Sequence, residues 1–465
     1  MTKTVPSKIS ADAVEAFRAD FAGQVSVPGD PDYDEVRRVW SGTIDRRPAL
    51  VARCTGVADV MRAVDFARTQ HVPTAIRGGA HNVAGTGTCD GGLVIDLSPM
   101  KGIRVDPAAR RVRAQPGVVW RELDRETQAF GLAVTGGLVS TTGIAGFTLG
   151  GGIGWLVRRC GMTCDNLIAA DVVTADGQLV VANELENTGL LWGLRGGGGN
   201  FGVVTSLEYA LHPVGPVIGG LVIYSAADAR TVLSKYRTLA AGAPDELSTV
   251  VSLLSIPPVP FVPPDSHGKP AIAVLVCWSG PITEGEAVVA PYRSLAEPIA
   301  DVIGPMPYTA QQTMLDPLWP KGTLTYWRSG FLPELSDGAV DTLLDRAWPN
   351  GLTEIHLHHL GGAVTRYGDD HAAYRNREAA FAYNLLARWA DPAEDTSCRA
   401  WARSAHESME RFGTGAAYLN FLPAEDEEPV RATFGADAYA RLVALKDRYD
   451  PGNLFRLNHN IRPRG

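Results

Sequence analysis

The first hundred residues alternate between runs with the spacing of strands and a run with the spacing of a helix. Residues 48–53 and 72–76 are short apolar runs of the kind that forms strands. Between them, in residues 56–70, apolar side chains recur at i, i+3, i+4 and i+7 from Val60 to Ala67, which is the period of a helix. The pattern therefore predicts a β-α-β unit in this part of the chain.

Similar patterns continue to about residue 213 and then change. Up to that point we expect helices at 11–21, 118–129 and 190–194, and strands at 93–97, 112–115, 172–175 and 200–211. Beyond it, strand-like runs at 218–224, 250–254, 271–277 and 354–358 alternate with helical stretches at 226–241, 336–348 and 372–389. This order predicts an antiparallel sheet with helices covering one face.

Composition limits the kind of protein that this can be. A chain of 465 residues with 45% hydrophobic and 20% charged residues can bury a sizeable core in two or three domains. The net charge of −8 argues against a nucleic-acid binder, which would show a basic stripe. The longest apolar run, 271–278, is far shorter than the ~20 residues of a membrane helix. No basic segment followed by an apolar stretch opens the chain, so we expect a cytoplasmic protein.

The strand at 72–76 leads into a glycine-rich loop, Arg77-Gly78-Gly79-Ala80-His81-Asn82. Glycines let the backbone curl, so that successive N–H groups converge on an anion such as a pyrophosphate. His81 at the mouth of this loop could act as a base, a ligand or a nucleophile. The alternative is a surface turn with a solvated histidine. The loop lacks the Gly-x-Gly-x-x-Gly fingerprint of a dinucleotide-binding helix.

A second glycine cluster occupies residues 146–154, with Phe147, Leu149 and Ile153 interleaved. Interleaved apolar residues argue against a flexible linker. Glycines at these positions suit a backbone pressed against a flat ring system, which side chains would push away. The alternative is tight packing between elements of the protein itself.

Six cysteines, at positions 54, 89, 160, 164, 277 and 398, are too few for a disulfide scaffold. Cys160 and Cys164 could pair or bind a metal, but no second pair of cysteines complements them. We therefore expect no metal site in this protein.

Several short motifs, taken together and in order, carry a specific resemblance. They are Arg77 to His81, Thr142-Gly-Ile-Ala-Gly-Phe-Thr-Leu-Gly-Gly-Gly152, Asp165-Asn166, Thr174-Ala-Asp-Gly177, Arg195-Gly-Gly-Gly-Gly-Asn-Phe-Gly-Val-Val-Thr205, Tyr418-Leu-Asn-Phe421 and Tyr449-Asp-Pro-Gly-Asn-Leu-Phe-Arg-Leu-Asn-His-Asn460. With these motifs the chain resembles the covalent flavoprotein oxidases that include the berberine bridge enzyme and 6-hydroxynicotine oxidase, within the vanillyl-alcohol-oxidase fold.

The resemblance implies an α+β fold. It consists of a PCMH-type FAD-binding domain, built from two α/β subdomains, and a substrate domain whose antiparallel sheet is covered by helices. On this basis we expect the FAD-binding domain at 1–213 and the substrate domain at 214–415. The segment 416–465 carries family motifs again, so we expect it to return to the FAD-binding domain.

The resemblance also implies a covalently bound FAD, attached through the ring of His81 to the 8α-methyl group of the flavin. The residues expected to bind the cofactor are Arg77, Gly78, Gly79, Ala80, His81, Asn82, Gly85, Gly136, Thr141, Thr142, Gly143, Gly146, Gly150, Gly151, Gly154, Val204, Asn458 and Asn460. Some relatives form a second bond through a cysteine, but this chain has Val139 at that place, which predicts a single attachment. Cys164 is the alternative second site.

Candidate catalytic residues come from two places. On a strand, Glu354, His356 and His358 share one face, which suits a substrate pocket. Exposure to solvent or a His-x-His metal site are the alternatives. Tyr418 and Asn420 match the Tyr-x-Asn-Tyr motif of relatives, with Phe421 in place of the last tyrosine, and Tyr418 could serve as a base.

Two further comparisons with the family bear on the site. The segment Tyr326-Trp327-Arg328-Ser329 resembles one that lies beside the pocket in relatives, and an aromatic core cluster is the alternative. Plant relatives carry a glutamate base where this chain has Thr365-Arg366, so the role of base falls to Tyr418 or to the face formed by Glu354, His356 and His358.

The expected function is that of an FAD-linked oxidase that takes a hydride from a C–H next to O or N of a small-molecule or natural-product substrate and reduces O2 to H2O2. A dehydrogenase with another acceptor, a flavin carrier without catalysis, and a biosynthetic oxygenase or cyclase are the alternatives. We expect a monomer or homodimer that binds neither nucleic acid nor a membrane.

Overall fold

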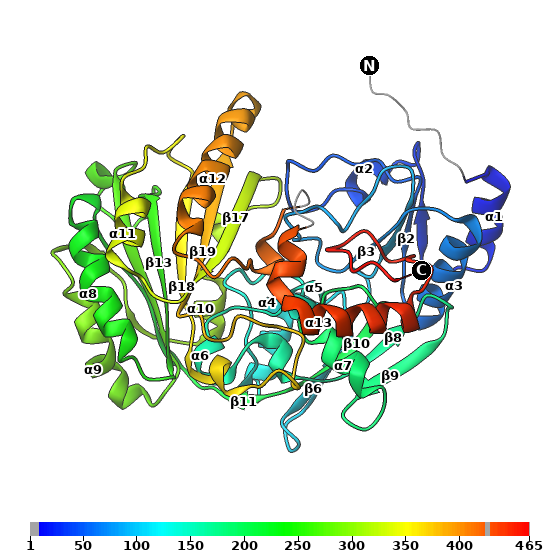
Figure 1. Ribbon diagram of the computed structural model, residues 1–465, viewed down its shortest axis with the longest axis horizontal. Coiled ribbons are helices and arrows are strands. Elements are labelled where there is room, and N and C mark those ends of the chain that lie inside the picture. The colour runs from blue at the N-terminus through cyan, green and yellow to red at the C-terminus, as the bar shows by residue number, and fades with distance from the viewer. Residues whose placement is uncertain (1–8, 424–427, 465) are drawn as a thin grey trace.

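The computed structural model describes residues 9–423 and 428–464, and its elements form two halves that lie side by side (Figure 1). One half carries the β-α-β unit and the glycine-rich loops. The other half carries one large antiparallel sheet with helices on its outer face. This mixed architecture confirms the expected α+β fold class.

The first half begins with a small sheet in the order β1-β2-β4-β3, in which β2 and β3 both run parallel to β4. Its elements are α1 (Ala11–Ala19), β1 (Gln24–Ser26), α2 (Tyr33–Val36), β2 (Leu50–Arg53), α3 (Val57–Gln70), β3 (Thr74–Arg77) and β4 (Leu93–Asp96). Helix α3 buries Val60, Ala63 and Val64 because its apolar period is that of a helix, as the sequence predicts.

A five-stranded antiparallel sheet follows in the order β5-β6-β10-β8-β9, and β7 pairs with β11 beside it. The elements are β5 (Ile103–Asp106), β6 (Arg111–Ala114), α4 (Trp120–Gln128), β7 (Leu132–Ala133), α5 (Ile144–Leu149), α6 (Val157–Cys160), β8 (Leu167–Val173), β9 (Leu179–Asn183), α7 (Thr188–Leu194), β10 (Val203–Ala210) and β11 (His212–Pro213).

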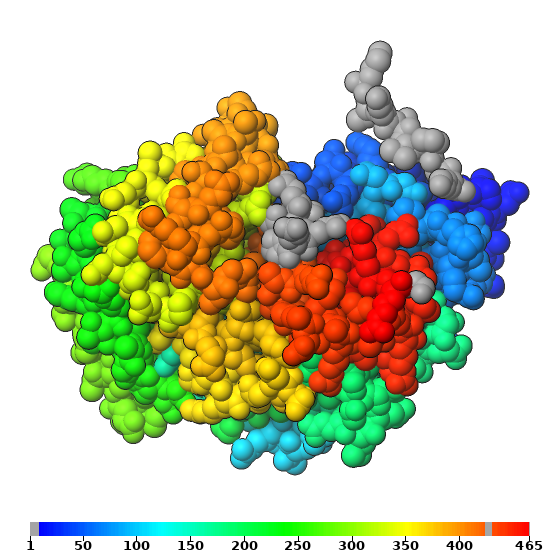
Figure 2. Space-filling model, viewed as in Figure 1, coloured from blue at the N-terminus to red at the C-terminus, as the bar shows by residue number. Residues whose placement is uncertain are grey.

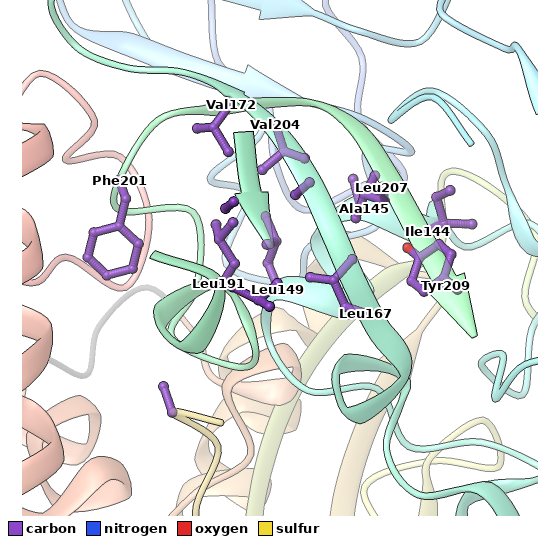
Figure 3. Packing of buried hydrophobic residues seen from close by; sticks show 14 of the residues in the cluster. Ile144, Ala145, Leu149, Leu167, Val172, Leu191, Phe201, Val204, Leu207 and Tyr209 are labelled. Carbon is purple, nitrogen blue, oxygen red and sulfur yellow. The ribbon is translucent and has the colours of Figure 1, made fainter. Parts of the chain in front are cut away.

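Helix α5, at the second glycine cluster, rests on the core of this sheet. Figure 3 shows its residues Ile144 and Leu149 packed with Leu167 and Leu207 from the strands. The hydroxyl groups of Thr148 and Tyr209, 2.8 Å apart, form a hydrogen bond inside the same core. The glycine cluster is thereby held on a rigid base.

The second half is an antiparallel sheet in the order β15-β12-β14-β13-β18-β19-β17, with β16 paired to β12. Its elements are β12 (Val217–Ser225), α8 (Ala229–Ala241), β13 (Leu247–Ser255), β14 (Pro270–Trp278), α9 (Ile282–Arg293), β15 (Pro298–Asp301), β16 (Gly304–Met306), α10 (Tyr308–Thr313), β17 (Leu324–Leu332), α11 (Asp337–Leu344), β18 (Glu354–His359), β19 (Phe381–Trp389) and α12 (Asp395–Glu410). Helices α8, α9, α11 and α12 cover its outer face (Figure 1).

One predicted element is wrong. The stretch 372–389 is not a helix, because its second part is strand β19, inserted between β18 and β17. Both neighbours supply backbone hydrogen bonds, and both faces of the strand are covered: Leu385 packs in the core beneath the helices and Leu386 on the opposite side. A strand that is apolar on both faces has no alternation to distinguish it from a helix.

The C-terminal segment packs against the first half, where helix α13 (Glu428–Tyr449) lies against α7. In Figure 2 this segment, in red, adjoins the blue N-terminal part. The buried ammonium of Lys446 pairs with Asp450 and donates to the carbonyls of Asn200 and Phe455. This buried charge network fixes the last residues beside the glycine-rich loops. Within the described residues, no helix is both long and apolar enough to cross a membrane.

Candidate active site

A deep cavity lies between the glycine-rich loops of the first half and the inner face of the large sheet. Of the residues expected at the site from the sequence, its lining contains Arg77, Gly78, Gly79, Ala80, His81, Asn82, Thr142, Gly143, Gly146, Gly150, Val204, His356, His358, Asn420 and Asn458. Among the described residues, the lining does not include Gly85, Gly136, Thr141, Gly151, Gly154, Glu354, Tyr418 or Asn460. The structure thus brings residues from distant parts of the chain to one place.

The loop from Gly78 to Asn82 presents its backbone to this cavity. Within the described part of the chain, none of the N–H groups of these residues donates a hydrogen bond. Two of their carbonyls bind elsewhere in the protein, since that of Ala80 accepts from the N–H of Trp40 and that of Asn82 from the N–H of Gly85. Ala80 itself has a positive φ of 58°, which a residue with a side chain adopts only when the surroundings impose it. Unpartnered N–H groups that face a cavity fit the pyrophosphate of a dinucleotide.

Other buried polar atoms at the cavity also lack partners. Arg77 pairs with Asp96 through Nη2 at 2.7 Å, but its Nη1 has no hydrogen bond to any described residue. The same holds for Oδ1 of Asn458 and Nε2 of His459, which come from the C-terminal segment. Buried polar atoms are normally satisfied, so this donor and acceptor set fits a large polar cofactor such as FAD.

Two glycines hold the two loops together. A Cβ on Gly79 would lie 2.4 Å from the backbone of Gly143, and a Cβ on Gly143 would lie 2.5 Å from the backbone of Gly79. Only residues without side chains permit such an approach. It places Thr141 and Thr142 directly beside His81.

The imidazole of His81 is oriented on three sides. Its Nε2 lies 3.1 Å from Oγ1 of Thr141, its Nδ1 lies 3.5 Å from Oγ1 of Thr142, and its ring stacks on Trp40 at 5.1 Å. Burial, together with the positive charge of Lys321, lowers the pKa of His81 to about 4. The ring is therefore neutral near pH 7 and has a free electron pair for bond formation.

The glycines at 146–154 serve two purposes. A Cβ on Gly146 would meet nothing within 4 Å, so this residue leaves room in the cavity as expected for a flat ring. A Cβ on Gly151, Gly152 or Gly154 would instead meet protein atoms, such as the carbonyl oxygen of Gly136 at 1.6 Å from Gly154. For these three the tight-packing alternative holds. Gly85 and Gly136 are likewise explained by close side chains, those of Ile44 and Trp120.

Two matched substitutions separate these purposes. Gly154→Ala should destabilise the fold by about 3 kcal/mol or more, because its methyl group overlaps backbone that cannot move aside. Gly146→Ala, within helix α5, should leave the urea midpoint of unfolding unchanged or slightly raised. It should nevertheless lower the ratio of flavin to protein absorbance severalfold. Equal flavin content in Gly146→Ala and wild type would show that the ring does not lie on this residue.

The inner face of the large sheet carries a linked set of polar side chains. Nε2 of His356 lies 2.8 Å from Oε2 of Glu354, and Oε1 of Glu354 accepts from Nη1 of Arg388, also at 2.8 Å. His356 lines the cavity, while Glu354 lies behind it and Ile355 packs on the helix side of the sheet. The alternation along β18 therefore places the predicted face toward the cavity and leaves His356 held by a carboxylate.

His358 lies next to His356, with ring centroids 5.9 Å apart. Burial and the neighbouring His356 lower the pKa of His358 to about 3, so its ring is neutral. In the described part of the chain, neither ring nitrogen has a hydrogen-bond partner. Within the described residues, no group of three or more His, Cys, Asp or Glu side chains is placed to hold a metal ion.

The hydroxyl of Tyr418 is turned toward the glycine cluster. It accepts hydrogen bonds from the backbone N–H groups of Gly152 at 2.8 Å and Ile153 at 3.1 Å, and from Nδ2 of Asn420 at 2.9 Å. Burial raises the pKa of Tyr418 well above its ordinary value. Phe421, not Tyr418, faces the cavity. The geometry favours a role for Tyr418 in positioning the cluster over a role as base.

Tyr418→Phe tests this interpretation. The substitution leaves two buried N–H groups without an acceptor and should lower the free energy of unfolding by about 1–3 kcal/mol. The rate constant for anaerobic reduction of the flavin should stay within about tenfold of wild type. A fall of ~10²-fold or more in this rate constant, with unchanged stability in urea denaturation, would show instead that Tyr418 acts as the general base.

The candidate sites of a second flavin bond differ in access. Val139 lines the cavity. Cys160 and Cys164 are both buried and free, and burial raises the pKa of each thiol. Their thiols are thus protonated and weakly nucleophilic at neutral pH.

Some residues at the cavity were not foreseen from the sequence. Trp40 and Trp319 come from loops, and no pattern relates them to each other. Asn384 and Arg388 could not be predicted as site residues, because their strand, β19, was expected to be a helix. A polar residue inside an otherwise apolar run was the available signal for Asn384. Trp327, whose segment was expected beside the pocket, lines it together with Trp40, Trp319 and Asn384, whereas Arg388 lies behind Glu354.

Comparison with known proteins agrees with this geometry. Residues 48–183 match the model of an FAD binding domain, and residues 417–462 match the model described as berberine and berberine like. An FAD-linked oxidoreductase of Dictyostelium discoideum is 31% identical over 97% of each chain. The (R)-6-hydroxynicotine oxidase of Paenarthrobacter nicotinovorans is 29% identical over 95% of this chain and 97% of its own.

Solved structures show the same fold over nearly the whole length. That of 6-hydroxy-D-nicotine oxidase from Arthrobacter nicotinovorans superposes with a TM-score of 0.85 at 27% identity, covering 95% of this chain and 98% of its own. A chitooligosaccharide oxidase superposes with a TM-score of 0.83 at 21% identity, covering 97% and 100% of the two chains. The second likeness bears on the fold alone.

Proposed function

Since this chain belongs to the family of berberine-bridge-enzyme-like FAD-linked oxidoreductases, we propose that it is an oxidase with FAD attached covalently through His81. The reaction is the removal of a hydride from a C–H next to O or N of a small molecule, with reduction of O2 to H2O2. The observation that carries the proposal is a neutral imidazole held beside a loop of unpartnered N–H groups.

FAD, when bound, supplies the two-electron acceptor and passes the electrons to O2. The chain supplies the rest. The N–H groups of Gly78 to Asn82 and the guanidinium of Arg77 hold negative charge of the cofactor. Thr141 and Thr142 hold the ring of His81 so that one nitrogen carries the proton and the other forms the bond. A covalent bond prevents loss of the cofactor.

We assign the role of proton acceptor to His356. Its ring lines the cavity, and its Nε2 donates to the carboxylate of Glu354, which leaves Nδ1 as the accepting nitrogen. Arg388 holds Glu354 from behind, and the carboxylate stabilises the imidazolium that forms. Asn420 lines the cavity near this site and also donates to the carbonyl of Phe147 on α5.

The oxidase activity is tested with anaerobic and aerobic measurements on the same substrate. A panel of alcohols, amines and natural-product intermediates is first screened for bleaching of the flavin without oxygen. With a substrate that bleaches it, admission of air should restore the yellow colour at once and yield one H2O2 for each substrate oxidised. Reoxidation that is slow in air but fast with an artificial dye would identify a dehydrogenase and contradict the proposal.

A further inference from the structure

A row of polar side chains crosses the inner face of the large sheet. Pairing of the strands sets Ser252, His356, Asn384 and Ser329 side by side, from β13 through β18 and β19 to β17. Directly paired residues of neighbouring strands point to the same face. Oγ of Ser252, Oδ1 of Asn384 and Oγ of Ser329 are all buried, and none of them has a hydrogen-bond partner within residues 9–423 and 428–464. Of these four residues His356 and Asn384 line the cavity, so the unsatisfied Oδ1 of Asn384 calls for a ligand that hydrogen-bonds to it.

At the cavity, acceptors and donors come from Asn384 of this row and from His358, which lies two residues beyond His356 on β18. Their exposed fractions are 3% and 1%, and both line the cavity. Both nitrogens of His358 and Oδ1 of Asn384 have no hydrogen-bond partner among the residues that the structure describes. A neutral imidazole offers one N–H and one lone pair, so together these side chains suit a hydroxyl or carbonyl group.

The rest of the substrate side of the cavity is apolar and carries a cluster of aromatic rings. Three indoles, those of Trp40, Trp319 and Trp327, lie with their ring centroids 5.8 to 6.3 Å apart. Phe421 packs edge-on against Trp327. Such walls bury flat apolar surface and stack on rings.

The charges around the cavity argue against an ionic substrate. Among the described residues of the lining, Arg77 is the only Lys, Arg, Asp or Glu, and it pairs with Asp96 beside the glycine loop. Glu354 is already bound to His356 and Arg388. The guanidinium of Arg388 also lies 4.1 Å from the centroid of the Trp319 ring, so one face of this indole already holds a cation. A buried ammonium or carboxylate would remain unpaired, at a high cost in free energy.

We propose that the substrate is an uncharged aryl alcohol, whose ring packs among Trp40, Trp319 and Trp327 and whose polar groups bind His358 and Asn384. This assignment rests on the proposed oxidase function. The carbinol C–H bond breaks with its electron pair going to FAD, the hydroxyl proton goes to His356, and a carbonyl forms. O2 takes the two electrons together with two protons, one from the transferred hydride and one from His356, and becomes H2O2. A sugar fits poorly, because it carries a hydroxyl on nearly every carbon and the aromatic wall satisfies few of them.

Three probes of one shape test the charge preference on the wild-type holoenzyme. They are 2-naphthalenemethanol, 2-naphthylmethylamine and 2-naphthoate, which differ at pH 7 mainly in the charge of one substituent. Cellobiose is added as a fourth ligand to test binding of a sugar. Quenching of tryptophan fluorescence measures binding without turnover. The alcohol should bind at least tenfold more tightly than each of the other three. Equal or tighter binding of any of them, or no binding of the alcohol at millimolar concentration, would overturn the assignment.

Two variants test the polar row. Asn384→Leu keeps a similar volume and should weaken binding of 2-naphthalenemethanol about tenfold, while 2-methylnaphthalene, which has no hydroxyl, should bind within twofold of wild type. Ser329→Ala is the matched control, since Ser329 belongs to the row but lies outside the cavity lining. An equal loss for both ligands in Asn384→Leu would contradict the role of the row. Release of the flavin by acid would refute the covalent attachment alone and leave these binding results standing.

Discussion

Replacing His356 with glutamine should lower the rate of anaerobic flavin reduction by ~10²–10⁴-fold, which is the contribution of a positioned general base. Glutamine can still donate to Glu354, so the carboxylate keeps a partner and the sheet should fold normally. Its amide accepts no proton near neutral pH. The measurement is stopped-flow absorbance of the flavin after mixing with substrate in the absence of oxygen.

His358→Gln serves as the control for this experiment. Its ring lies 5.9 Å from that of His356 and lines the same cavity, but it has no carboxylate partner. The substitution should weaken substrate binding and leave the limiting rate of reduction within about tenfold of wild type. If His356→Gln reduces the flavin within threefold of the wild-type rate, the proton goes to another group and the assignment of His356 is wrong.

The second large effect is expected from His81→Ala. The variant should fold, because the ring of His81 lines the cavity and stacks on Trp40, so its loss widens the cavity and removes no residue of a hydrophobic core cluster. FAD should still bind through the N–H groups of the loop, but all of it should appear in the supernatant after acid precipitation. Reduction should also be slower, because a histidyl bond withdraws electrons and raises the flavin potential.

Thr141→Val is a useful companion to that variant. It keeps the shape of the threonine and removes the hydroxyl that lies 3.1 Å from Nε2 of His81. Covalent attachment should then be slower but complete in time, since the nucleophile is still present. Covalent flavin in His81→Ala itself would show that another residue forms the bond.

Local patterns were enough to predict much of the fold. The β-α-β unit and helix α3 follow from apolar period, and the loop at Arg77 follows from its glycines. The alternation on β18 correctly predicted that His356 and His358 face away from Ile355 and Leu357. Each of these depends on neighbours within a few positions along the chain.

Features set by tertiary structure could not be predicted in this way. Strand β19 was expected to be a helix because both of its faces are covered, a property that only its neighbours in the sheet determine. Trp40 and Trp319 meet through folding alone. The sequence motif singled out Tyr418, yet the direction of its hydroxyl depends on the backbone of Gly152 and Ile153, which approach from far along the chain.

The central claim, a single covalent bond between FAD and His81, is tested most directly on the wild-type protein. Acid precipitation followed by proteolysis and mass spectrometry of the yellow peptides locates the flavin. We expect all of it on the peptide that contains His81, and none on those with Cys160 or Cys164. Flavin released entirely into the acid supernatant, or found on either cysteine, would contradict the account.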